Sequence, residues 1–218
     1  MIVVNFKTYR EATGYKAINL ARICKRVQED TGVRIIAVPQ VADLRNCVET
    51  GADCWVQHVD PVEQGKNTGW ITREDVEEAG AMGTLLNHSE HKLELEVLGR
   101  TMAVVGGLAF ESCVCAAGPD EAVKVAELIP DYIAYEPPEF IGSKDKSVST
   151  ERPEIIEQVV KSVTFPVLVG AGIHNAEDVK VALKLGAKGV LLATDVVLSE
   201  VPEKELRDLA MAFGHVSP

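Results

Sequence analysis

The amino-acid sequence predicts a (β/α)8 barrel, and three observations lead to this fold class. Short runs rich in β-branched residues alternate with amphipathic segments from one end of the 218-residue chain to the other. Eight such strand–helix units are the number that closes a barrel of parallel strands. Several runs are apolar on both faces, as expected when helices cover a parallel sheet. A doubly wound open sheet has the same alternation and remains the alternative.

Each predicted strand is a short run of residues with high β-propensity. In chain order the strands are IVVNF (2–6), RIIAVP (34–39), DCWVQHV (53–59), GTLLNH (83–88), ESCVCAA (111–117), YIAYE (132–136), PVLVGA (166–171) and GVLLAT (189–194).

The predicted helices have apolar residues that recur on one face. In the first helix this stripe comprises Tyr15, Ile18, Ala21, Ile23 and Val27. Residues 154–163, 176–185 and 202–213 have the same periodicity, and residues 93–108 have it with interruptions by glycine. No linker, low-complexity tract or change in composition divides the chain, so residues 1–218 are expected to form a single domain.

The charge and the hydropathy of the chain exclude several classes of partner. It carries 33 acidic against 22 basic residues, a net charge of −11, which argues against nucleic acid or an anionic membrane as a partner. No apolar run is long enough to span a bilayer, and the first residues do not resemble a secretory signal. We therefore expect a cytoplasmic protein.

The cysteines form no Cys-x-x-Cys pair, and they are interpreted as reduced, small core residues. They are Cys24, Cys47, Cys54, Cys113 and Cys115.

In a barrel of this kind, catalytic residues come from the carboxyl ends of the strands and from the loops that follow. Asn5 and Lys7 end the first predicted strand, His88 ends the fourth, and Glu136 ends the sixth. Taken singly, each has a simpler explanation as a solvated charge or a helix cap. These four residues occur together with turns after the seventh and eighth strands whose backbone N–H groups could bind a phosphate. This combination predicts an active site.

These motifs, in this order, resemble the triosephosphate isomerase family, in particular its archaeal branch. The matching motifs are Asn-x-Lys (5–7), Asn-His-Ser-Glu-His (87–91), Tyr-Glu-Pro-Pro-Glu-x-Ile-Gly (135–142), Gly-Ala-Gly-Ile (170–173) and Gly-Val-Leu-Leu-Ala (189–193). The resemblance covers nearly the whole chain, and the motif after the sixth strand is the most specific.

The resemblance implies an enzyme that interconverts dihydroxyacetone phosphate and D-glyceraldehyde 3-phosphate in glycolysis and gluconeogenesis, without cofactor or metal. Glu136 would be the base, and His88 would donate a hydrogen bond to the substrate carbonyl. Lys7 would supply positive charge and Asn5 would orient the substrate oxygens. Glu90 either holds Lys7 in place or is a charge at the start of a helix.

The resemblance also implies a mobile lid and a phosphate cradle. The prolines that follow Glu136 would stiffen one end of the lid, and Ile141 and Gly142 would form its tip. Backbone N–H groups of Gly172, Ala193 and Thr194 would hold the phosphate.

The chain departs from the family pattern at two places. The lid reads Ile-Gly-Ser-Lys where the family has Ile-Gly-Thr-Gly, which concerns the kinetics of the lid rather than the chemistry. Asp195 follows Thr194 where a glycine is usual, and we expect its side chain to turn away from the phosphate and cap the last helix.

The long segment after the third strand, with Thr68 and Gly69 at its tip, resembles the family's interdigitating loop. This implies a homo-oligomer, either a dimer or a tetramer.

Two other functions compete with the isomerase. Other phosphate-binding barrels, such as epimerases and synthases, share the cradle, and some need a metal held by His and Asp. His58 and Asp60 come closest to such a pair. A barrel that binds a metabolite without turnover is the second alternative, and the presence of Glu136, His88 and Lys7 together argues against it.

Overall fold

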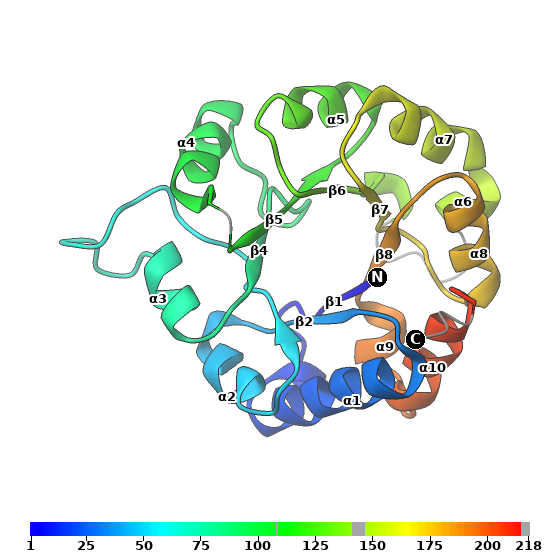
Figure 1. The fold of residues 1–218 in the computed structure, drawn as a ribbon, viewed down its shortest axis with the longest axis horizontal. Helices are drawn as coiled ribbons and strands as arrows, with labels where there is room; N and C mark the ends of the chain where they lie inside the picture. The colour runs from blue at the N-terminus through cyan, green and yellow to red at the C-terminus, as the bar shows by residue number, and fades with distance from the viewer. Residues whose placement is uncertain (108, 141–146, 215–218) are drawn as a thin grey trace.

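The computed structural model describes residues 1–107, 109–140 and 147–214, and in them eight parallel strands form a ring that is surrounded by helices (Figure 1). The predicted (β/α)8 barrel is confirmed. The strands are Ile2–Asn5 (β1), Ile35–Val38 (β2), Asp53–Cys54 (β3), Gly83–Leu86 (β4), Glu111–Ala116 (β5), Tyr132–Tyr135 (β6), Val167–Val169 (β7) and Gly189–Leu192 (β8).

The helices follow the strands in alternation. The α-helices are Tyr15–Thr31 (α1), Leu44–Val48 (α2), Arg73–Glu78 (α3), Leu95–Val105 (α4), Pro119–Ala126 (α5), Val148–Glu151 (α6), Pro153–Ser162 (α7), Ala176–Lys184 (α8), Thr194–Val197 (α9) and Pro202–Met211 (α10). Short 3-10 helices occupy Arg10–Ala12 (η1), Val41–Asp43 (η2) and Pro138–Phe140 (η3).

The barrel closes between β3 and β4. The paired strands run in the order β3-β2-β1-β8-β7-β6-β5-β4, and the two end strands meet through backbone hydrogen bonds. The N–H of Val56 donates to the carbonyl of Gly83 at 2.9 Å, and the N–H of Leu85 donates to the carbonyl of Val56 at 2.9 Å. β3 is shorter than the predicted run of residues 53–59. Val56 makes only an isolated bridge to Thr84, and the side-chain amide of Gln57 donates to the carbonyls of Lys7 and Val38.

Alternate strand residues point into the barrel and form its interior cluster. Its members are Val3, Ile36, Val38, Trp55, Leu85, Cys113, Cys115, Ala134, Leu168 and Leu191. The other face of the strands packs against the helices. Trp55 is fully buried, and a Cβ at Gly83 would lie 2.8 Å from its indole nitrogen and 2.4 Å from the carbonyl oxygen of Glu111. Only glycine fits at residue 83.

A polar network lies at the amino ends of the strands. Arg34 binds the carboxylate of Glu111 with two hydrogen bonds of 2.8 and 2.6 Å, and the indole N–H of Trp55 donates to the same carboxylate at 3.2 Å. Burial would raise the pKa of Glu111, but the hydrogen bond and charge of Arg34 outweigh it and lower that pKa below its usual value. This network occupies the amino end of the barrel, so a binding or catalytic site is expected at the carboxyl ends of the strands.

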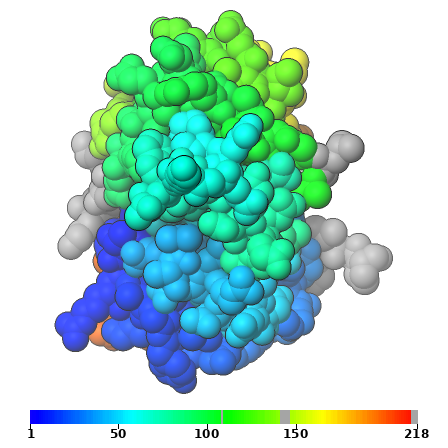
Figure 2. Space-filling view, turned by 90° about the vertical axis from the view of Figure 1, so that its left-hand side faces the viewer, coloured from blue at the N-terminus to red at the C-terminus, as the bar shows by residue number. Residues whose placement is uncertain are grey.

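The segment between β3 and α3 projects beyond the ring of helices (Figure 1). When the molecule is turned so that this side faces the viewer, the segment lies in the middle of the exposed surface, in cyan (Figure 2). Its Trp70 is half exposed, with 51% of its surface accessible. Thr68 and Gly69 lie in this projecting segment, away from the barrel axis.

Candidate active site

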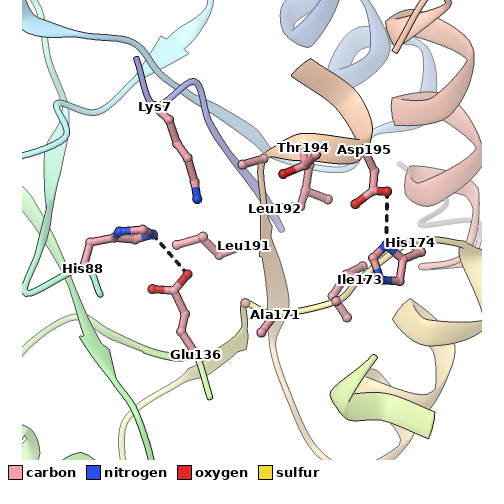
Figure 3. Close-up of a pocket in the computed structure, with 13 residues that line it drawn as sticks. Lys7, His88, Glu136, Ala171, Ile173, His174, Leu191, Leu192, Thr194 and Asp195 are labelled. Carbon is pink, nitrogen blue, oxygen red and sulfur yellow. Dashed lines mark hydrogen bonds and ion pairs between the residues drawn. The ribbon is translucent and has the colours of Figure 1, made fainter. Parts of the chain in front are cut away.

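The carboxyl ends of five strands contribute to one pocket, which is drawn in Figure 3. Side chains from the β1, β4 and β6 ends face backbone from the β7 and β8 ends. Its lining residues are Lys7, His88, Glu136, Gly170, Ala171, Gly172, Ile173, His174, Leu191, Leu192, Ala193, Thr194 and Asp195.

Glu136 and His88 face each other across this pocket (Figure 3). The Nε2 atom of His88 lies 3.3 Å from Oε1 of Glu136, and both residues are buried, with 6% and 4% of their surfaces exposed. Within the described residues, Oε2 of Glu136 has no hydrogen-bond partner. One oxygen of this buried carboxylate therefore has no donor in the part of the chain that the structure describes, which is an uncommon arrangement and typical of functional sites.

The backbone of the turn after β4 sets the tautomer of His88. The N–H of Glu90 donates to Nδ1 of His88 at 3.2 Å. Nδ1 is therefore an acceptor, and the ring proton of a neutral imidazole resides on Nε2, pointing toward Glu136.

The same turn is shaped by Asn87, whose φ of +57° lies in the left-handed region. Its side-chain amide donates to the carbonyl of Cys115 at 2.8 Å, and its oxygen accepts from the N–H of Leu93 at 3.0 Å. These bonds tie the His88 turn to β5. Asn tolerates the left-handed conformation better than most residues.

Lys7 is fixed in place by hydrogen bonds to its backbone and by an ion pair of its ammonium group. Its φ of +48° is rare for a residue with a side chain and costs about 1–3 kcal/mol. Asn5 Oδ1 accepts from the Lys7 N–H at 2.9 Å, and the Gln57 amide donates to the Lys7 carbonyl at 2.8 Å. Nζ of Lys7 lies 2.6 Å from Oε1 of Glu90. Glu90 thus contacts Lys7 and lies in the turn before α4, not at the start of that helix.

The expected phosphate cradle lies on the opposite side of the same pocket. Gly172 has a φ of +62°, and Ala193 and Thr194 line the pocket at the end of β8. The hydroxyl of Tyr9 lies 3.3 Å from Oγ1 of Thr194 and so links the β1 and β8 ends. The predicted lid residues Ile141 and Gly142 lie outside the described residues.

The expectation that Asp195 caps the last helix is wrong, because the last helix, α10, begins at Pro202 after Val201, and Asp195 belongs to the short helix before it. α9 begins at Thr194, so Asp195 lies inside its first turn, and the capping position is occupied by Ala193 without a side-chain hydrogen bond. Oδ1 of Asp195 instead lies 3.1 Å from Nδ1 of His174, and both residues line the pocket (Figure 3).

Three residues that shape the pocket had no role predicted for them from the sequence. Gln57 fixes the Lys7 backbone, His174 contacts Asp195, and Gly170 lies against Glu136. A Cβ at Gly170 would be 2.9 Å from Cγ of Glu136. A signal existed for His174, because an imidazole directly after the Gly-Ala-Gly-Ile turn enters the same end of the barrel.

Among the described residues, no group of three or more His, Cys, Asp or Glu side chains is arranged to hold a metal ion. Nε2 of His58 is bonded to Asp60 at 3.1 Å, and its ring lies over that of His91 with 4.3 Å between centroids. No helix in the described part of the chain combines the length and the hydropathy that a membrane crossing requires.

Comparison with known proteins agrees with this geometry. The profile of the triosephosphate isomerase family matches residues 1–204. The triosephosphate isomerase of Methanothermus fervidus is 42% identical over 215 residues, which are 96% of each chain. Those of Methanobacterium bryantii and Methanocaldococcus jannaschii are 42% and 41% identical over 96% of this chain and 95% and 98% of their own. These relatives are archaeal, as the motifs implied. The chain belongs to the triosephosphate isomerase family.

Proposed function

We propose that Glu136, His88, Lys7 and Asn5 carry out the reaction of this isomerase, the interconversion of dihydroxyacetone phosphate and D-glyceraldehyde 3-phosphate in glycolysis and gluconeogenesis. One observation carries the assignment. A buried oxygen of Glu136, which has no hydrogen-bond donor among the described residues, lies in the same pocket as the His88 imidazole, whose Nε2–H points inward.

Glu136 acts as the base. It removes a proton from the carbon beside the substrate carbonyl, and the electron pair of that C–H bond forms the carbon–carbon double bond of an enediolate. Glu136 then returns the proton to the neighbouring carbon, while the hydroxyl proton passes from one oxygen of the enediolate to the other, so the carbonyl and hydroxyl groups exchange places and no atom is gained or lost. Removal of water from the carboxylate makes the transfer easier, and triosephosphate isomerase is itself the standard example of such tuning.

His88 stabilises the negative charge that develops on the substrate oxygen. Its neutral imidazole donates from Nε2 first to the carbonyl oxygen and then to the enediolate, because Nδ1 is engaged by the N–H of Glu90. In the structure that Nε2–H faces Oε1 of Glu136, and the substrate oxygen would take this position. A donor already aimed at the developing charge needs little reorganisation during the reaction.

Lys7 supplies the fixed positive charge in a chain whose net charge is −11. Its ion pair with Glu90 and its bonded backbone keep the ammonium group at the pocket. Asn5, through its bond to the Lys7 N–H, orients Lys7 and reaches the substrate oxygens. Backbone N–H groups of Gly172, Ala193 and Thr194 hold the phosphate, with Ile141 and Gly142 closing over it as a lid.

The functional unit is a homo-oligomer, a dimer or a tetramer, in the cytoplasm, and each chain is a single domain over residues 1–218. A second cavity of about 580 Å³ opens beside Asn5, Lys7 and Glu90. The projecting segment with Thr68 and Gly69 in one chain would fill this cavity in another. Sedimentation at micromolar concentration tests this assembly, and a fully active monomer would contradict it.

The decisive experiment replaces the base without changing its shape. Glu136→Gln should lower kcat by about 10²- to 10⁴-fold, because the amide cannot accept the proton. Glu127→Gln is the matched control, since Glu127 is exposed at the end of α5 and does not line the pocket, and it should keep full activity. A coupled assay for glyceraldehyde 3-phosphate isomerisation measures both variants, and an unimpaired Glu136→Gln enzyme would refute the assignment.

The same assay separates the isomerase mechanism from its competitors. Activity that a chelator leaves unchanged supports the proton-transfer mechanism. Loss of activity with chelator would instead indicate a metal-dependent barrel enzyme, and a folded protein without any turnover would indicate a binding protein.

A further inference from the structure

We propose that His174 and Asp195 form a charge pair that makes phosphate binding depend on a proton, so that the pair determines affinity for the doubly charged phosphate group. The proposal rests on the proposed function, because it places the phosphate at the β7 and β8 ends. His174 is a positioning and specificity residue here, acting on the ester through Asp195 and through its own charge.

The geometry brings both groups to the cradle. His174 directly follows the turn that contains Gly172, and Asp195 directly follows Thr194. Both line the pocket that contains Glu136 and Lys7, and Nδ1 of His174 lies 3.1 Å from Oδ1 of Asp195 (Figure 3). Their side chains are 17% and 36% exposed, so solvent screens them only in part.

The charges around the pair make an unpaired Asp195 unfavourable for the substrate. Within the described chain, the titratable side chains that line this pocket or bond to His174 are Lys7, His88, Glu136, Asp178 and Asp195. The ammonium group of Lys7 is already paired with Glu90. Among the described residues, a phosphate dianion at the cradle would therefore approach the Asp195 carboxylate with little local positive charge to balance it.

Protonation of His174 removes this conflict. With a neutral imidazole the pair carries a net charge of −1, and with an imidazolium it carries none. Asp178, whose Oδ2 accepts from the His174 backbone N–H at 3.0 Å, adds a second negative charge that favours the imidazolium. A dianion should therefore bind together with one proton, which is taken up by His174, and binding should weaken as the pH rises above the pKa of that imidazole in the complex.

Sulfate is the probe that tests this proton linkage, because it stays doubly charged throughout the neutral range. Its dissociation constant, measured by calorimetry from pH 6 to 8.5, reports anion binding without any need for turnover. In the wild type the constant should rise with pH. In Asp195→Asn it should be equal or lower, with a weaker pH dependence, because the carboxylate that repels the anion is gone.

The two single variants and the double variant form a double-mutant cycle. If the pair acts through charge, the two single variants should change sulfate affinity in different directions, whereas loss of a merely structural contact would weaken binding in both. His174→Ala leaves the negative charge of Asp195 without a positive partner. It should weaken sulfate binding and raise KM by about tenfold, with kcat nearly unchanged. This factor lies between those measured for exposed and for buried ion pairs. The double variant should return both values to those of Asp195→Asn. Thermal unfolding of each variant shows that folding is intact.

Three results would overturn the proposal: equal losses in both single variants that add in the double variant, sulfate binding that does not vary with pH in the wild type, or no effect of any variant. Each is distinct from a failure of the catalytic assignment. That failure would appear as undiminished turnover in Glu136→Gln, whereas sulfate binding does not depend on which residue is the base.

Discussion

The position of the Glu136 carboxylate depends on the absence of a side chain at residue 170, and Gly170→Ala tests that dependence. Gly170 follows β7, and its N–H donates to the carbonyl of Tyr135 at 2.8 Å, so it lies beside the end of β6. A Cβ added there would be 2.9 Å from Cγ of Glu136 and 3.2 Å from Cβ of Leu191. The backbone of Gly170 is not left-handed, so alanine is allowed by conformation and the effect is purely one of space.

The expected loss can be worked from these distances. Carbon atoms in contact prefer separations of about 3.5–4.0 Å, so Cγ of Glu136 must move by roughly 0.6–1 Å. A displacement of about 1 Å in a catalytic group lowers the rate on the order of 100-fold. We therefore expect kcat to fall by about 30- to 100-fold, with a much smaller change in KM because the cradle residues are not displaced.

Gly99→Ala is the matched control for this substitution. Gly99 lies inside α4, where an added Cβ would make an ordinary contact of 3.7 Å with Leu128. It should keep full kcat and raise the free energy of unfolding by up to about 1 kcal/mol, since alanine favours a helix more than glycine does. The coupled isomerisation assay and thermal unfolding measure both variants. A Gly170→Ala enzyme with wild-type kcat would refute the reasoning.

Three further predictions concern the support of the site and the core. Gln57→Leu removes the side-chain donor to the carbonyl of Lys7, whose backbone is strained, so it should lower the free energy of unfolding by about 1–3 kcal/mol and reduce kcat. A kcat equal to that of the wild type would show that Lys7 needs no such support. All five cysteines are buried, and burial raises the pKa of Cys47 to about 12, so thiol reagents should react only after unfolding, and a fast-reacting native thiol would contradict this. Burial also lowers the pKa of His58 despite its bond to Asp60, so the unfolded chain binds its proton first as the pH falls. This part of the stability is complete above pH of about 6.5 and is lost below it, so the decline of Tm from pH 7 to 5 should be shallower in His58→Gln, and identical slopes would exclude the effect.

The barrel was predictable because its signal is repeated eight times. Each strand has a core-facing run, and the long helices keep their apolar stripes. The short helices α2, α3, α5, α6 and α9 were not foreseen, because one or two turns give too little periodicity to identify. The strands also end earlier than predicted at the site: β4 stops at Leu86 and β8 at Leu192, where the chain leaves the pairing direction to form the pocket.

The site was predictable only in part. Glu136, His88 and Lys7 follow strands, and the carboxyl ends of parallel strands meet at one end of a barrel. Contacts between loops depend instead on strand register, which no local pattern encodes. The pairing of Tyr135 with Val169 brings Gly170 against Glu136, and the bond from His174 to Asp195 depends on where α9 begins. Asp195 would have been the cap that the sequence indicates only if that helix had begun two residues later.

The charged groups of the pocket differ in whether they have partners. Lys7 is paired with Glu90 and His174 with Asp195, so each nitrogen base is matched by a carboxylate that fixes its position. Glu136 differs, because one of its oxygens has no hydrogen-bond partner within the described residues. A buried polar atom without a partner costs about 1–3 kcal/mol of stability. In the proposed mechanism that oxygen accepts the proton of a substrate C–H bond, so the stability lost in the resting enzyme would be recovered as the proton is transferred.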